Sequence, residues 1–212
     1  MKTKIQLCIF LLAILLLTVN NLYSQSCTQC DNTGNPPGTL ASEIGQNTTA
    51  YGSYSFAGGV NSTAEGGVSF AFGSNAYSQS AYAISLGSST TALKSNSFAL
   101  GSFCTSNGTN SFVLGNGLNS STKLTNSVDN SLMIGFYSDK PTLFIGESNG
   151  IGSTGKIGIG DITNPLAKLH IKADDGEQAA LFIEPYTFGG TYDAELWMGT
   201  SDYGLRAAYG KL

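Results

Sequence analysis

The sequence predicts an all-β protein whose central part is a β-solenoid, a roll built from stacked short coils. Two observations lead to this class. Gly is abundant, with 27 of 212 residues, and charged residues are scarce at 11%, unlike the Glu-, Lys-, Ala- and Leu-rich mixture of helical proteins. The motif Asn-Ser-Phe-Ala-Leu-Gly at 96–101 recurs almost unchanged at 110–115, fourteen residues later. Such an interval indicates an internal structural repeat.

Residues 1–24 have the pattern of a signal peptide. Lys2 and Lys4 precede an apolar run from Ile5 to Val19, and a polar stretch follows, with cleavage expected after Ser24. A retained membrane anchor is the first alternative, but the apolar run is short for a span. A lipoprotein attached through Cys27 is the second, and it lacks the usual apolar residue three positions upstream. We therefore expect a secreted protein or one on a bacterial cell surface or outer membrane.

Residues 25–40 are expected to form a linker that contains Cys, Pro and Gly. Cys27 and Cys30 form a Cys-x-x-Cys pair, for which a disulfide or an inter-chain link is plausible in an exported chain. A zinc site would need further ligands, and His170 is the single histidine of the chain. A redox motif would need a helix after the pair, where Asn-Pro-Pro-Gly stands instead. No metal or cofactor is therefore predicted.

The repeat runs without insertion through residues 41–122. A glycine recurs every fourteen residues, and we call these residues the repeat glycines. The positions four before and five after each repeat glycine hold Ala or Ser throughout. The repeat glycines are Gly45, Gly59, Gly73, Gly87, Gly101 and Gly115.

Each period reads as strand, turn, strand, turn. Large apolar residues stand three and one before most repeat glycines, as Phe98 and Leu100 do, and a spacing of two places them on one face of a strand. Small residues occupy the alternate positions. The glycine is expected to close the strand with a positive φ or under close packing. Asn two residues later is a turn residue, and the small residue at plus five opens a second strand. One period is therefore one coil, stabilised by its neighbours in the stack.

A coil of this size encloses few side chains, so its second apolar face would remain exposed. A continuous exposed apolar row indicates an interface, and assembly around a symmetry axis would bury it. Phe103 and Cys104 depart from the residues usual in their turn. We expect both at one edge of the roll, with Cys104 either buried against a neighbouring subunit or free.

The repeat of residues 41–122 resembles the head repeat of trimeric autotransporter adhesins, which has a similar period and reads Asn-Ser-Val-Ala-Ile-Gly. The resemblance implies a left-handed parallel β-roll and a homotrimer on a bacterial surface that binds host or environmental ligands. Phe replaces the Val of the family in several copies, which predicts a bulkier packed face. The heptads and amphipathic membrane strands with which the family ends are not seen in the sequence.

Residues 123–160 are expected to form an irregular or capping region. The register breaks at 123–129, and the strand motif returns at 131–135, twenty residues after the previous copy. An insertion of six residues near 120–128 therefore predicts a loop or a capping coil. Further short strands are predicted at 143–146 and 156–160.

Residues 161–212 are expected to form a smaller β-rich segment belonging to an incomplete chain. The stretch 158–172 is similar to segments of bacterial surface fibres and phage tail fibres. Leu169 and Ile171 alternate with polar residues, which predicts an amphipathic strand. Residues 194–198 alternate likewise, and 179–184 read as a more continuous apolar strand.

The sequence offers little for catalysis or nucleic-acid binding. Loss of residues 1–24 removes two lysines and leaves 8 basic against 14 acidic residues, a net charge of −6, which disfavours nucleic acid. Gly150 to Lys156 resembles a P-loop, but Ile157 stands where Ser or Thr would bind magnesium. Glu43 and Glu65 are predicted on different faces, and His170 on an exposed one. The remaining acids, expected on solvated loops and strand faces, are Asp174, Asp175, Glu177, Glu184, Asp193, Glu195 and Asp202.

We therefore expect a non-catalytic, homotrimeric adhesin or structural surface fibre with an unknown extracellular ligand. A receptor-binding protein like a phage tail fibre is the second hypothesis, and a carbohydrate-active solenoid enzyme ranks last. The predicted signal peptide favours the first over the second, because tail fibres are assembled in the cytoplasm.

Overall fold

The structure is a computed structural model that describes residues 38–181, 194–197 and 204–207. These residues form strands and turns and no helix, so the all-β class is confirmed. The chain divides into two compact units, residues 1–172 and 173–212, which are treated separately below. The predicted signal peptide at 1–24 and the predicted pair Cys27 and Cys30 lie outside the described residues.

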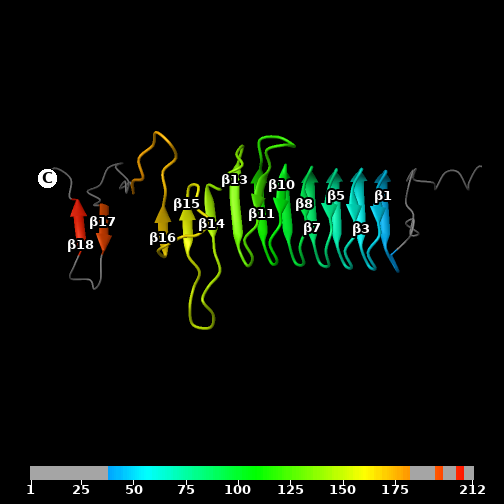
Figure 1. Ribbon diagram of the computed structural model, residues 1–212, viewed down its shortest axis with the longest axis horizontal. Coiled ribbons are helices and arrows are strands. Elements are labelled where there is room, and N and C mark those ends of the chain that lie inside the picture. Colours follow the sequence, from blue (N-terminus) through cyan, green and yellow to red (C-terminus); the bar gives the residue numbers. More distant parts are fainter. Residues whose placement is uncertain (1–37, 182–193, 198–203, 208–212) are drawn as a thin grey trace, which may run out of the picture. The chain divides into compact units, whose positions relative to one another are not determined.

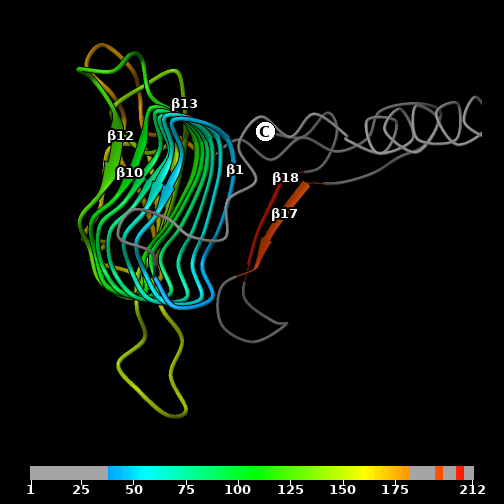
Figure 2. The ribbon, with the colours of Figure 1, turned by 90° about the vertical axis from the view of Figure 1, so that its right-hand side faces the viewer.

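The first unit is a parallel β-solenoid with two sheets (Figure 1). Viewed along the roll, its coils superpose, with β10 and β12 on one side and β1 and β13 on the other (Figure 2). The ten-stranded sheet contains β1 (Ser42–Gln46), β3 (Phe56–Val60), β5 (Phe70–Ser74), β7 (Ile84–Ser88), β9 (Phe98–Ser102), β11 (Phe112–Asn116), β13 (Leu132–Phe136), β14 (Leu143–Ile145), β15 (Ile157–Ile159) and β16 (Leu169–Ile171). The six-stranded sheet contains β2 (Thr49–Ala50), β4 (Thr63–Ala64), β6 (Tyr77–Ser78), β8 (Thr91–Ala92), β10 (Cys104–Ser106) and β12 (Leu124–Asn126).

The strand register confirms the fourteen-residue coil. Ser42 pairs with Phe56, and Phe98 pairs with Phe112, in parallel strands. The six-stranded sheet has the same step, as between Thr49 and Thr63. Each coil therefore contributes one strand to each sheet, and equivalent residues of successive coils form straight rows.

The predicted insertion is also confirmed, and it lies in one loop. The backbone N–H of Gly117 still donates to Ser102, as the regular register requires, whereas that of Leu124 donates to Phe103. The chain between them turns back on itself, with the N–H of Leu118 donating to Thr122. Parallel pairing then resumes with a step of twenty, from Phe112 to Leu132. The coil structure thus continues through β13, beyond the predicted end of the regular repeat.

The chain reverses direction after β13. β14 pairs antiparallel with both β13 and β15, and β16 then pairs parallel with β15. The connection between β14 and β15 projects from the roll (Figures 1 and 2). The strands predicted at 143–146, at 156–160 and around Leu169 are therefore present.

In the second unit, β17 (Ala194–Trp197) pairs antiparallel with β18 (Gly204–Ala207). β17 confirms the strand predicted at 194–198. The strand predicted at 179–184 is not confirmed where it can be seen, because residues 179–181 are not in a strand; residues 182–184 lie outside the described residues.

Small side chains fill the interior of the roll. Ala57, Ala71 and Ala99 have no exposed surface, and neither have Ala50 and Ala64 of the facing sheet. Polar members of this core bond between the two layers, as where the Ser85 hydroxyl donates to Thr90 Oγ1 at 2.8 Å. The core side chains become larger toward the antiparallel end, where the buried cluster contains Cys104, Val113, Leu124, Met133 and Phe144.

The repeat glycines combine both features expected of them. All six have a positive φ, between 98° and 144°. A Cβ on Gly101 would also lie far inside contact distance of the carbonyl oxygen of Gly115 in the next coil. They stand fourth in five-residue strands rather than at the strand end, so the strand bends at the glycine and continues for one more residue.

Candidate interaction face on the ten-stranded sheet

The outer face of the ten-stranded sheet carries the large apolar residues of the repeat. They form two rows along the sheet, because the register aligns equivalent positions of every strand. The first row contains Phe56, Phe70, Ile84, Phe98, Phe112, Leu132, Ile145, Ile157 and Leu169. The second row contains Ile44, Phe72, Leu86, Leu100, Leu114, Ile134, Leu143, Ile159 and Ile171. We call these two rows the apolar face.

The apolar face is long and accessible. Ten strands about 4.8 Å apart make it about 43 Å long. Its side chains are partly exposed, and Ile44 and Phe72 keep 42% and 47% of their surface in contact with solvent. An exposed apolar surface of this length is typical of an interaction site.

Three phenylalanines reinforce one part of this face. The rings of Phe56 and Phe70 stack with centroids 4.9 Å apart, and Phe72 lies 6.4 Å from Phe70. Gly58 interrupts the second row, and a Cβ there would meet the Phe72 ring at 2.5 Å. The gap in the row is therefore filled by the neighbouring aromatic ring, and the surface stays continuous.

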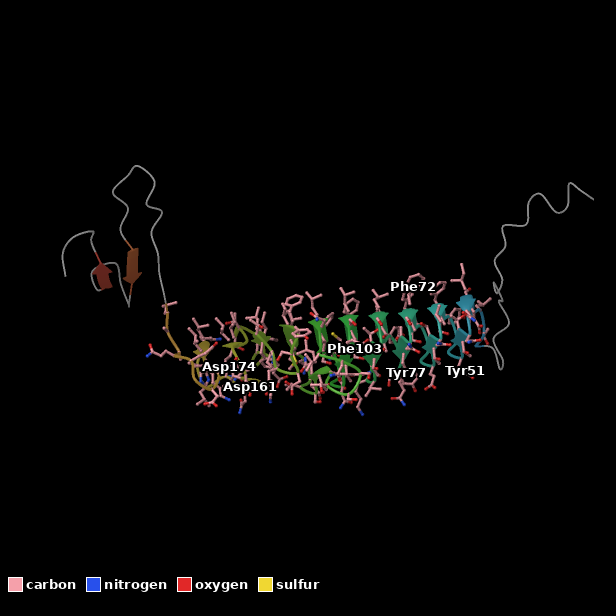
Figure 3. All side chains as sticks on the ribbon, turned by 90° about the horizontal axis from the view of Figure 1, so that it is seen from above. Tyr51, Phe72, Tyr77, Phe103, Asp161 and Asp174 are labelled. Atoms are coloured by element: carbon pink, nitrogen blue, oxygen red, sulfur yellow. The ribbon has the colours of Figure 1, made fainter. Side chains whose placement is uncertain are left out.

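The outer face of the six-stranded sheet is polar by contrast. Its central row is mainly threonine, from Thr49 to Thr125, with Tyr77 in the third coil. The Tyr77 hydroxyl donates to Glu65 Oε2 at 2.6 Å, and burial together with this carboxylate raises the pKa of Tyr77 to about 12. Figure 3 shows Phe72 on one long side of the roll and Tyr51 and Tyr77 on the other.

The residues considered for catalysis are not brought together. Glu43 lies inside the roll, where its Oε1 accepts a hydrogen bond from the Ala50 N–H, whereas Glu65 lies outside. This separation agrees with the prediction of different faces. His170 is half-buried rather than exposed, and its Nδ1 accepts from the Leu166 N–H at 3.2 Å. Among the described residues, no group of three His, Cys, Asp or Glu side chains could hold a metal ion.

Two further sequence features have a structural explanation. The P-loop-like stretch ending at Lys156 leads into strand β15, whereas a P-loop lysine stands at the start of a helix. Asp174, Asp175 and Glu177 are exposed, as expected for solvated acids. Glu184, Asp193 and Asp202 lie outside the described residues, and nothing is described for the side chain of Glu195.

Cys104 is buried within its own coil. It has no exposed surface, and its Sγ lies 3.2 Å from the Gly115 carbonyl oxygen and 3.4 Å from that of Ser102. The thiol is free, and burial raises its pKa. The residue thus takes the place of the small buried residue of its row rather than facing a subunit neighbour. Phe103 occupies the preceding turn with a φ of 52°.

Sequence reasoning missed the full length of the apolar face. It identified the rows within the regular repeat, but β14, β15 and β16 extend them with Leu143, Ile157 and Leu169. The alternation of apolar residues in those short strands was the available signal, and the reversal of strand direction concealed their alignment.

In comparisons with known proteins, no family model, curated protein or solved structure matches the chain. In the part of the chain that the structure describes, no helix is long and apolar enough to cross a membrane.

Proposed function

We propose that this chain is a non-catalytic fibre or adhesin-like protein, exported to the cell surface or beyond, that assembles as a homotrimer through the apolar face. The observation that carries the proposal is the pair of apolar rows along the ten-stranded sheet, each with a member on nine of its ten strands. The roll is proposed to be left-handed, as in the adhesin heads that the repeat resembles.

The physical reason for assembly is the thinness of the coil. In the regular coils the interior is filled by small side chains such as Ala71 and Ser85, and the phenylalanines of these coils stay on the outside. Full burial of a Phe or Leu side chain contributes about 1.5–3 kcal/mol, and each copy offers a long series of them. An identical copy provides an apolar surface of the same length and with the same distance between successive strands.

A threefold axis parallel to the roll uses both rows. The first row of one copy would then meet the second row of the next at the same height, and the ring of contacts closes after three copies. The polar threonine row of the six-stranded sheet would face solvent in this arrangement. The resulting assembly would be a slender rod, suited to displaying a surface away from a cell.

The test is the mass of the chain lacking residues 1–24, measured by light scattering after size exclusion. We expect three times the mass of one chain. Replacing Phe72 and Leu100 by Ser should give monomers that keep the β-sheet circular dichroism spectrum. Thr63→Ser and Thr91→Ser on the polar face provide the matched control and should leave the trimer intact. A monomeric wild-type protein would refute the proposed assembly.

A further inference from the structure

A separate surface lies at the corner where the chain approaches each strand of the ten-stranded sheet. The residue five before the repeat glycine, or before Gly135 in the last coil, has a φ between 51° and 59° in seven successive coils. This is the left-handed region, and the row formed by these residues is called the upstream corner. Its members are Leu40, Tyr54, Val68, Tyr82, Asn96, Asn110 and Asn130.

The second half of the upstream corner has the residues that its backbone favours. Asparagine tolerates the left-handed conformation better than other residues with a side chain. The amide of Asn96 donates to Asn110 Oδ1 at 3.0 Å, and that of Asn110 donates to Asn130 Oδ1 at 2.8 Å. The amide of Asn130 donates in turn to Glu147 Oε2. Local stability alone explains this half.

The first half contradicts the same local preference. A bulky or β-branched residue with positive φ is a conformational outlier, and Tyr54, Val68 and Tyr82 occupy three successive coils. Burial does not compensate for the strain, because Tyr54 and Tyr82 keep 61% and 57% of their surface exposed. A row of strained, exposed residues in successive coils points to a functional requirement for their side chains, which a single such residue would not.

The form of this row indicates the shape of its ligand. Residues on either side of it along the chain are small, such as Ser53 and Ala81, so the larger side chains stand above the surface. Tyr54 and Tyr82 are two coils apart, which is about 9.6 Å along the roll. No acidic or basic residue lies in this half of the corner or next to it in the chain. The matching ligand is therefore uncharged, linear and periodic.

We propose that the first half of the upstream corner binds an extended β-1,4-linked polysaccharide lying along the roll. In such a chain every second sugar presents the same face, and the disaccharide length is close to the separation of the two tyrosines. The apolar C–H face of a sugar ring would lie on each tyrosine ring, while the phenol and Ser53 hydroxyls form hydrogen bonds with sugar hydroxyls. This site is distinct from the apolar face and goes beyond the proposed assembly.

The test measures retention of the chain lacking residues 1–24 on cellulose and on chitin powder, with starch granules as the helical-glucan control. We expect retention on at least one extended polysaccharide and none on starch. The variant Tyr54→Asn with Tyr82→Asn should reduce retention at least about ten-fold through loss of the two ring contacts. Asn is chosen because the same row uses it in the later coils, so the fold should tolerate both changes.

Tyr137→Asn is the matched control. Tyr137 is 73% exposed and also left-handed, with a φ of 55°, but it lies two residues after Gly135 and outside the upstream corner. This variant should bind like the wild type. The proposal is overturned if the wild type binds neither powder, or if the double variant binds as well as the wild type. A double variant with altered light-scattering mass would assign the tyrosines to a subunit contact instead, which also overturns it.

Discussion

The inside and the outer apolar face of the roll reverse the size order of an ordinary protein core. Ala57 and Ala71 fill the interior, while their neighbours in sequence, Phe56 and Phe70, stack on the outside. The reason is the short distance between the two layers in the regular coils, where the buried side chains are mainly Ala and Ser. Backbone pairing between coils thus builds the roll, and the large side chains remain for contacts with other molecules.

The largest effect is expected at the repeat glycines, where successive coils lie too close to leave room for a Cβ. Gly101→Ala would place a Cβ against the Gly115 carbonyl oxygen at a φ of 129°. We expect a loss of more than about 4 kcal/mol in the free energy of unfolding, measured by urea denaturation. Gly67→Ala is the control, because a Cβ there would have its nearest neighbour 3.9 Å away. Equal losses in the two variants would show that the close approach of successive coils does not restrict this glycine.

A neighbouring pair of residues compares the two surfaces directly. Ala71→Leu enlarges a side chain that has no exposed surface, and overpacking of this kind costs about 1–3 kcal/mol. Phe72→Leu changes the outer face, where the neighbouring side chains can adjust, and its loss should be below about 1.5 kcal/mol. Thermal unfolding of both variants measures the difference. A larger loss for Phe72→Leu than for Ala71→Leu would show that packing on the outer face contributes more to the stability of the roll than packing in its interior.

The smallest effect is expected at Cys104, where the rate of reaction with a thiol reagent reports access to the interior of the roll. In the chain lacking residues 1–24, with Cys27→Ser and Cys30→Ser, Cys104 is the one remaining thiol, and it should react slowly with a nitrobenzoate disulfide in the native protein and fully once unfolded. The thiolate is the reacting form, and burial raises the pKa of Cys104. The reaction should therefore stay slow even when the pH reaches the pKa of an ordinary thiol. Thr125→Cys on the exposed outer face should react at once. Rapid native labelling of Cys104 would contradict a closed interior.

The coil was predictable from the sequence because its causes are local. Glycine recurs at positions where no Cβ fits, such as Gly59 and Gly87. Small and large residues alternate along each strand, which places them on opposite faces of the sheet. Spacing alone does not say which face lies inside, since that depends on the distance between the sheets. The step of twenty after Gly115 was visible as a break, but the resumed pairing of Leu124 with Cys104 was not.

The upstream corner shows a different limit. Asn96 and Asn110 carry a sequence signal for left-handed turns, whereas Tyr54 and Val68 in equivalent positions carry the opposite one. Only the alignment of coils reveals that all share one conformation. Sequence propensity therefore fails where a residue adopts a backbone conformation that its type disfavours. The polysaccharide site is inferred from residues of this kind.

The β16 end of the ten-stranded sheet differs from the regular coils. A stack of identical parallel coils is a template that another copy could extend end to end. Here β14 reverses the direction, β15 restores it, and the last strand of the sheet, β16, has only three residues. Lys168 and Lys172 flank β16 and are held by the Thr154 oxygens and by Asp161 respectively. Short, lysine-flanked edges discourage strand addition, so this edge of the sheet is a poor template for a strand of another copy.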